Sequence, residues 1–155
     1  MSRAFVKEPE GGEAFEDLPD RPISSEPNFV TPEGLDMIEA ELERLHQSHA
    51  AAQAGEDKAT LARTSRDLRY WTARRNSAQV VTPPKDASEV HFGSSVTIER
   101  EDGRRQTFRI VGEDEADPAK GTIPYVAPVA KALTGKRVGD VVQAGASEAT
   151  IVAIA

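Results

Sequence analysis

Two adjacent carboxylates form the part of this sequence with the clearest capacity for chemistry. Glu56 and Asp57 follow Gly55 in a short polar interruption between two segments of helical periodicity. Neighbouring carboxylates at a projecting turn can hold a hard divalent cation such as Mg²⁺ when a partner molecule supplies the other ligands. Acidic residues at a turn also cap helices. The residues leave both roles open, and they predict no metal site that the chain could form on its own.

The histidines offer a second set of candidate ligands. Glu43, His46 and His49 have a spacing that places metal ligands on one helix face, as in di-metal helical bundles. Such a site also needs ligands from a facing helix, and the following segment supplies arginines instead. His91 adjoins Phe92, with no carboxylate or nucleophile close by in the sequence. Packing or surface roles are therefore favoured for the histidines.

Two further motifs fail on their spacing. Gly135-Lys136 resembles the end of a phosphate-binding loop, but Ala130 and Arg137 stand where that loop needs Gly and Ser or Thr. The acidic run 113–117 lacks the alternating carboxylates and the glycine of a calcium loop, so a solvated turn is expected. A cysteine count of zero excludes thiolate chemistry. We therefore predict that the chain is not an enzyme and has no cofactor of its own.

Length and charge restrict the class of protein. The chain has 155 residues and a formal net charge of −7, with 38% hydrophobic and 29% charged residues. The acidic total argues against bulk binding to nucleic acid or anionic membranes, because both need a cationic surface. No stretch approaches the roughly 20 apolar residues of a membrane span, and the first residues lack an apolar signal core. A soluble cytoplasmic protein is expected.

Residues 1–30 are expected to form an acidic, extended tail. They contain four prolines, two adjacent glycines, and seven acidic against three basic residues. A segment with so little to bury stays extended unless a partner holds it. It could lie along a partner, fold back on the arginines of the second helix, or stay disordered. A plain linker is favoured, although its scattered apolar residues could be docking points: Phe5, Phe15, Leu18, Ile23 and Phe29.

Residues 31–80 predict an antiparallel helical hairpin, or coiled coil. Thr31 can cap the first helix, and Pro32 suits its first position. Gly55 is expected to adopt the left-handed conformation that ends this helix, and Asp57 to start the next. Each helix has a coiled-coil seam with steps of three and four. The first seam is Leu35, Ile38, Leu42, Leu45, His49 and Ala52, and the second is Leu61, Thr64, Leu68, Trp71, Arg75 and Ala78.

Opposite charges support the pairing of the two helices. Residues 33–53 carry five acidic residues and one basic residue, whereas residues 57–79 carry six basic and two acidic residues. Arms of opposite charge select each other as partners. The arginine-rich face also suggests contact with nucleic acid, but the acidic arm beside it cancels much of that field.

Residues 81–155 predict a small α+β domain of about five strands and one short helix, a size that can fold alone. Apolar residues alternate from Val90 to Ile98 as in a half-buried strand, and Asp102-Gly103 is typical of a hairpin turn. The remaining strands are expected at 106–111, 123–126, 141–142 and 150–154. The short helix is expected at 128–133 and is ended by Gly135.

The order of these blocks resembles the GreA/GreB (Gre-type) transcription elongation factors of bacteria. The blocks are VHFG at 90–93, FRIVGEDEAD at 108–117, APVAKAL at 127–133 and VGDVV at 138–142. The segment FVTPEGL at 29–35 also resembles the start of the family's first helix. The resemblance therefore covers residues 29–155.

This resemblance implies an FKBP-like C-terminal domain and binding to bacterial RNA polymerase. In that family the domain docks on the rim of the polymerase's secondary channel, and the coiled coil enters the channel. Acidic residues at the tip help to hold a second catalytic Mg²⁺, which speeds cleavage of backtracked RNA by the polymerase itself. Nucleic acid is then contacted indirectly, through the polymerase. The chain is expected to act as a monomer.

The resemblance assigns docking to the loop and helix around Pro128. The family has a polar pair before this proline, whereas this chain has Val126 and Ala127. We therefore predict docking through a more apolar surface that also includes Val129 and Lys131.

The resemblance also indicates a shortened arm and an altered tip. Residues 31–76 are roughly twenty fewer than in the family, which shortens each arm by about 15 Å at about 1.5 Å per residue. The family's tip reads Gly-Asp-x-x-Glu-Asn, and here Ala59 stands at the second acidic position. The short-armed regulators of nucleoside diphosphate kinase share this general plan. We therefore predict a polymerase-binding regulator of transcription without strong cleavage activity.

Three alternatives remain open. The chain could be a cleavage factor in which Glu56 and Asp57 share a Mg²⁺ with the polymerase. The implied fold also suggests a peptidyl-prolyl isomerase, which needs an aromatic-lined pocket; the domain offers Phe92, Phe108 and Tyr125 for it. The third alternative is a coiled-coil adaptor for an unrelated protein.

Overall fold

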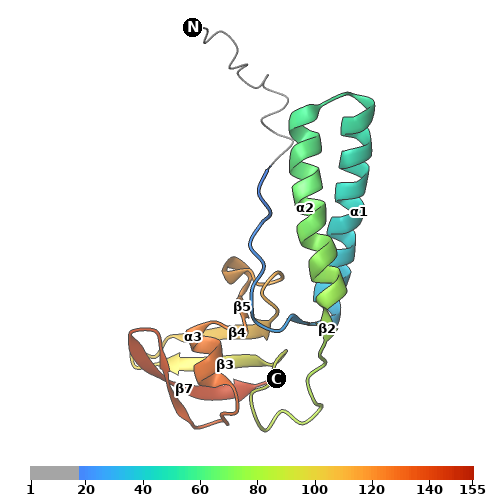
Figure 1. The fold of residues 1–155 in the computed structure, drawn as a ribbon. Helices are drawn as coiled ribbons and strands as arrows, with labels where there is room; N and C mark the ends of the chain where they lie inside the picture. The colour runs from blue at the N-terminus through green and yellow to red at the C-terminus, as the bar shows by residue number, and fades with distance from the viewer. Residues whose placement is uncertain (1–17) are drawn as a thin grey trace, which may run out of the picture. The chain divides into compact units, whose positions relative to one another are not determined.

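The computed structural model describes residues 18–155, which form two units (Figure 1). The hairpin unit contains Ile38–Ser77 and the segment of the chain that ends at Ser25. The sheet unit contains Glu26–Met37 and Ala78–Ala155. Phe5 and Phe15, two candidate docking points of the tail, lie outside the described residues.

Two long helices, α1 (Pro32–Ala54) and α2 (Lys58–Ser77), occupy the stretch in which a hairpin was expected. The Thr31 hydroxyl accepts a hydrogen bond from the Gly34 amide at 3.0 Å, so it satisfies one of the free amides of the first turn. Pro32 occupies the first helical position, where its missing amide costs nothing. The predicted start of the first helix is confirmed.

The seam of α1 buries a residue at every second turn. Ile38, Leu45 and Ala52 are buried and lie seven residues apart, as in a coiled coil. Between them His49 is half-buried, and its Nδ1 lies 2.7 Å from the Thr64 hydroxyl of α2. This contact confirms the packing role that was favoured for His49.

The seam of α2 differs from the prediction in its last turns. Arg74 is buried, whereas Arg75, the predicted seam residue, is exposed. Arg75 instead donates to the Glu39 carboxylate of α1, at 3.0 Å, on the surface of the hairpin. Ala78 lies beyond the last helical residue, Ser77. The opposite charges of the arms thus meet where the seam was expected.

The sheet unit is built on five strands in the order β5-β4-β3-β7-β6, of which Figure 1 labels β5, β4, β3 and β7. The central strand β3 pairs antiparallel with β4 and β7, β7 pairs antiparallel with β6, and β4 pairs parallel with β5. Residue alternation places the apolar side chains of these strands on one face. The strands are β3 (Ser95–Arg100), β4 (Arg105–Val111), β5 (Thr122–Pro124), β6 (Val141–Ala144) and β7 (Ser147–Ile154).

One short helix, α3 (Pro128–Leu133), completes the core of the sheet unit. Its Ala130 and Leu133 are fully buried in one cluster with strand residues such as Ile98 and Ile151. The helix has the predicted bounds, and the fold class is the predicted α+β domain after a helical hairpin. A short 3₁₀ helix, η2 (Pro118–Lys120), precedes β5.

Several strand boundaries differ from the expected ones. The strand predicted from Val90 begins only at Ser95, because the His91 carbonyl accepts from the Ser94 amide (3.0 Å) and closes a turn. Gly93 has a φ of 87° in this turn, a conformation that breaks strand geometry. At the other end of the domain, β6 and β7 are longer than predicted, since they form a continuous hairpin across Gly145.

The end of the expected tail belongs to the sheet unit. β1 (Phe29–Val30) pairs in parallel with β2 (Gln79–Val80). The ring of Phe29 lies 6.2 Å from that of Phe92 and 5.4 Å from that of Tyr125, in edge and tilted arrangements. These contacts show that Phe29 is a packing residue of this unit rather than part of a linker.

Candidate functional site

The turn between α1 and α2 has the hydrogen bonds of a Schellman motif. The Asp57 amide donates to the Ala52 carbonyl at 2.9 Å, and the Glu56 amide donates to the Gln53 carbonyl at 3.3 Å. This pattern places Glu56, with a φ of 53°, at the left-handed position. The prediction that Gly55 occupies it was wrong, because α1 ends at Ala54 and the left-handed residue is the second after the helix.

Asp57 starts α2, as predicted. Its carboxylate accepts from the Thr60 amide at 3.1 Å and from the Thr60 hydroxyl at 2.6 Å. The hydrogen bond from the hydroxyl, followed by that from the amide, lowers the pKa of Asp57, because both donors favour the charged form. Both carboxylate oxygens therefore take part in the helix cap, each with one hydrogen bond.

Glu56 is the exposed acidic residue that remains at the tip. No hydrogen bond or ion pair within residues 18–155 engages its carboxylate, while the adjacent Asp57 is committed to the cap. One carboxylate supplies one or two of the six or so ligands that Mg²⁺ requires. The tip therefore fits a shared ion as a donor of one ligand group. Within the described part of the chain, no group of three His, Asp or Glu side chains could hold a metal ion.

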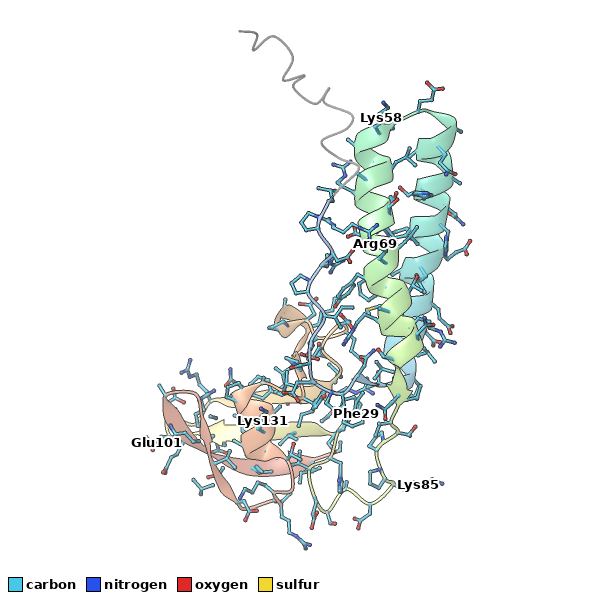
Figure 2. The ribbon with its side chains drawn as sticks, viewed as in Figure 1. Phe29, Lys58, Arg69, Lys85, Glu101 and Lys131 are labelled. Carbon is cyan, nitrogen blue, oxygen red and sulfur yellow. The ribbon has the colours of Figure 1, made fainter. Side chains whose placement is uncertain are left out.

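The loop before α3 holds the residues predicted to dock. Ala127 occupies the capping position of α3 in an extended conformation, with φ −65° and ψ 147°, and its methyl group provides no cap. Pro128 is the exposed first residue of the helix, and the Lys131 amide donates to the Ala127 carbonyl at 2.9 Å. Figure 2 shows Lys131 on this helix. The helix thus fixes the backbone of the predicted docking residues.

An apolar groove of about 500 Å³ adjoins this loop. Three predicted residues, Ala127, Pro128 and Val129, lie together in its wall. Val126 and Lys131 are not among the residues that line it. The other lining residues come from β4, β5, α3, β6 and the turn after β6, and they are Phe108, Ile123, Ala132, Gln143 and Gly145.

The aromatic residues available for an isomerase pocket lie mostly elsewhere. Phe92 and Tyr125 pack against each other, with ring centres 5.7 Å apart, and against Phe29. Phe108 is the single aromatic residue among those that line the groove. The groove therefore has the character of an apolar docking surface rather than of an aromatic-lined pocket.

One residue that sequence analysis missed anchors the first turn of α1. Glu115 accepts hydrogen bonds from the Thr31 amide, at 3.0 Å, and from the Thr31 hydroxyl. The hydroxyl in turn accepts from Gly34, so the carboxylate acts on the helix start through Thr31. The expectation of a solvated turn at 113–117 was wrong, because these five residues are half-buried and Glu115 is bonded to the helix start.

Glycines near this anchor gave a signal that could have revealed it. A Cβ atom at Gly34 would lie 2.0 Å from a Glu115 carboxylate oxygen, and one at Gly112 would lie 2.4 Å from the Phe29 carbonyl oxygen. Glycine in the first turn of a helix is unfavourable without such a reason. Gly34 therefore marks a close approach by another segment.

Comparison with known proteins gives a consistent result. The family model "Transcription elongation factor, GreA/GreB, C-term" matches residues 84–155. The transcription elongation factor GreB of Yersinia pestis is 35% identical over 144 residues, which cover 79% of this chain and 84% of that protein. GreB of Pseudomonas aeruginosa is 34% identical over 127 residues, with 70% and 76% covered.

Two solved structures are also similar to this chain. A GreA/GreB elongation factor from Nitrosomonas europaea has a TM-score of 0.42 and 22% identity, with 82% of this chain and 98% of that chain covered. GreA factor homolog 1 of Thermus thermophilus has a TM-score of 0.41 and 22% identity, with 84% and 99% covered.

No helix within residues 18–155 has the length and apolar character needed to cross a membrane. The identity to the GreB proteins extends over most of their length and, with the family model on the sheet unit, settles the relationship. The chain belongs to the GreA/GreB family of transcription elongation factors.

Proposed function

We propose that this chain regulates transcription elongation by binding bacterial RNA polymerase at the entrance of its secondary channel, without strongly stimulating RNA cleavage. Its relatives are named transcription elongation factors, which supports the role in elongation. The finer statement rests on two surfaces: the apolar groove beside Pro128 and the tip of the hairpin.

The groove is the main observation that supports docking on RNA polymerase. It lies in the part of the chain that the GreA/GreB model matches, and its wall includes Ala127, Pro128 and Val129. An apolar concavity with an exposed proline at its rim can bury an apolar anchor of a partner, and such anchors dominate binding energy at interfaces. The proposed docking surface is therefore apolar, as predicted from Ala127, whereas Val126 of the same predicted pair does not line the groove.

The tip of the hairpin supports the other part of the proposal, which is that the chain stimulates RNA cleavage only weakly. Each carboxylate oxygen of Asp57 accepts one hydrogen bond from Thr60, so Glu56 is the carboxylate of the tip that can turn to a metal ion without competing with the cap. The helices of 23 and 20 residues span roughly 30–35 Å at about 1.5 Å per residue. The alignment of 144 residues covers only 79% of 155, so it includes positions of the relative that have no counterpart here, which is consistent with a shortened arm.

Binding of the purified chain to bacterial RNA polymerase core tests the docking part of the proposal. We expect the chain to bind and to be displaced by a full-length cleavage factor. Pro128→Ala and the double change Val126→Asp/Ala127→Ser should each weaken binding about tenfold, because they remove apolar surface from the wall that would bury the partner's anchor or place a charge beside it. Glu101→Gln, an exposed change at the tip of the β3–β4 hairpin, is the matched control.

Two results would contradict this assignment. Unchanged affinity in both docking variants, with circular dichroism showing that they fold, would exclude the groove as the docking surface. Binding that a cleavage factor does not displace would place the contact outside the secondary channel.

A cleavage factor with a short arm is the second candidate, and the left-handed conformation of Glu56 favours it. Backbone strain at a projecting acidic residue is often retained for function. RNA release from stalled elongation complexes distinguishes the two candidates. Our proposal expects little release with the wild-type chain, whereas a cleavage factor would give release that Glu56→Ala abolishes and Asp57→Asn, which keeps the cap, does not.

A further inference from the structure

Residues 18–25, here called the strap, lie along α2 within the hairpin unit (Figure 1). Two contacts converge on Arg69, which Figure 2 labels midway along that helix. Its Nε donates to the Asp20 carboxylate at 2.5 Å, and its Nη2 donates to the Leu18 carbonyl at 3.3 Å. The strap therefore binds Arg69 through both a side chain and the backbone.

Arg21 of the strap makes further contacts with α2, and here the strap supplies the positive charge. The guanidinium of Arg21 lies 4.0 Å from the ring centre of Tyr70 and 5.8 Å from that of Trp71, and it donates to Asp67 at 3.4 Å. Cations over aromatic faces at these distances are attracted to the ring. Because Asp20 pairs with a base and Arg21 pairs with an acid, the strap is held in one register. General attraction between an acidic tail and a basic helix would not select that register.

The contacts between the strap and α2 are weak enough for the strap to dissociate. Arg69 and Asp20 keep 50% and 74% of their side chains exposed, and the apolar Ile23 is 52% exposed. Exposed ion pairs contribute little each and are screened by salt. The strap continues into buried Asn28 and β1, so it stays tethered when it is released, and tethering raises its local concentration.

We propose that the strap is a releasable internal cover of the cationic and aromatic face of α2 formed by Arg69, Tyr70 and Trp71. In the closed state Asp20 neutralises Arg69, and Arg21 covers Tyr70. In the open state the strap leaves and the face is exposed. The consequence for polymerase rests on the proposed function: the closed strap lowers affinity, because the hairpin must present α2 when it enters the channel.

Trp71 reports on the strap without any partner, because it is the single tryptophan of the chain. Quenching of its fluorescence by acrylamide, a neutral quencher, should rise about twofold when the full-length chain is moved from about 0.05 M to about 0.5 M NaCl, since the ion pairs are screened. Asp20→Lys and Arg21→Ala should show the high quenching already at low salt. Glu101→Lys, which makes the same charge change as Asp20→Lys on the sheet unit, should behave as wild type.

A charge exchange tests the register. Combining Asp20→Arg with Arg69→Asp should restore low quenching at low salt, whereas either change alone should not. Helicity at 222 nm verifies that each variant folds. Equal quenching in wild type, Asp20→Lys and Arg21→Ala at every salt concentration would overturn the proposal, and so would failure of the exchange to restore it in a folded chain.

The regulatory consequence has its own readout. Asp20→Lys should raise affinity for polymerase core about threefold at low salt, and Glu101→Lys should not. A variant that exposes Trp71 without changing polymerase affinity would overturn the inhibitory role of the strap. Absence of polymerase binding by any form would instead contradict the proposed function, while the fluorescence result would still decide whether the cover exists.

Discussion

Glu56 holds a backbone conformation that most residues avoid. A positive φ brings Cβ close to the following carbonyl, at a cost of about 1–2 kcal/mol that glycine does not incur. The Schellman motif fixes this position as the second residue after α1, and the neighbouring Gly55 lies one residue too early to relieve it. At the scale of single residues, the tip therefore gives up stability to present a carboxylate.

Replacing Glu56 with glycine should stabilise the hairpin. We expect Glu56→Gly to raise the free energy of unfolding by about 1 kcal/mol, because glycine adopts the left-handed conformation without strain. The measurement is thermal unfolding followed at 222 nm. Glu56→Ala is the matched control, since it removes the carboxylate and keeps the strain. Equal gains from the two variants would show that repulsion of the carboxylate, not its backbone, is what costs stability.

The cap formed by Asp57 should make the hairpin sensitive to acid. The pKa of Asp57 is lower in the folded state than in the unfolded state. Its contribution to the free energy of unfolding is therefore complete above the unfolded pKa of about 3.9, and it is lost as pH falls through the lower folded pKa. Asp57→Asn keeps an acceptor for the Thr60 amide and should flatten this part of the pH profile. Asp57→Ala should lower the melting temperature by a few degrees at pH 7. The check is the melting temperature between pH 2 and pH 7; a slope that is the same in wild type and Asp57→Asn would contradict the assignment.

At the scale of elements, the starts of the three α-helices differ in their capping. α1 has a hydroxyl cap supported by Glu115, α2 has a carboxylate cap, and α3 has no side-chain cap because Ala127 occupies the position. The two side-chain caps differ in how many residues they link. Only the cap of α1 depends on a residue far away in the sequence.

Glu115 and Gly34 should be coupled. A methyl group at position 34 would displace the carboxylate, so Gly34→Ala and Glu115→Ala should each destabilise the sheet unit by about 1–2 kcal/mol. In the double variant the steric conflict is gone and alanine favours the helix, so the combined loss should be smaller than the sum by about 1 kcal/mol. Urea unfolding of the four proteins measures this difference. Strict additivity would mean that the two residues do not meet.

A serine at position 127 should improve α3. The extended backbone of Ala127 already has the geometry of a capping residue, so a hydroxyl there can accept from a free amide of the first turn. We expect Ala127→Ser to add about 1 kcal/mol to the stability of the sheet unit. Amide hydrogen exchange in α3 would detect it, and Ala127→Val, which offers no acceptor, should show no gain.

Local signals made the helices predictable. Thr31, Pro32, Asp57 and the heptad spacing of α1 are visible in short windows, and the structure has these features where they were expected. The parallel pair of β1 and β2 has two residues in each strand and joins distant segments, so no pattern announces it. Few apolar residues mark the seam of α2, so the sequence did not show which of two neighbouring arginines would be buried. The structure buries Arg74 and leaves Arg75 on the surface, where it pairs with Glu39.

The candidate site was predictable to the same degree. The turn before Pro128 and the turn between α1 and α2 lie where they were predicted, because proline and glycine mark turns. The groove was not foreseen, since its wall combines residues from strands that only the folded sheet brings together. The left-handed residue was displaced by one position, because the motif counts from the last helical residue and sequence signals do not define that residue so closely.

At the scale of the molecule, the two units rely on different forces. The sheet unit has a cluster of fully buried apolar residues, including Val96, Ile110 and Leu133. The hairpin unit combines a narrower seam with exposed ion pairs such as Arg75–Glu39 and Arg69–Asp20. Salt weakens the second kind of interaction and hardly affects the first.

Salt should therefore separate the two units. Raising NaCl from about 0.05 M to about 0.5 M should lower the midpoint of the helical transition at 222 nm by a few degrees, because the ion pairs of the hairpin are screened. Amide exchange in β3 and β7 should stay unchanged. A parallel loss of protection in those strands would mean that the units unfold as one.

The short parallel pair of β1 and β2 also bears on how the chain is made and how it can change. Phe29 pairs with Gln79, which is 50 positions further along, so the helical hairpin is an insertion whose two ends are clamped together by the sheet unit. On the ribosome, β1 must wait for the whole insertion to be synthesised before its partner strand emerges. In evolution, equal numbers of residues can be added to or removed from the two arms while the clamp keeps both ends in place. The arm can thus be lengthened or shortened without any change in the surface that carries the groove.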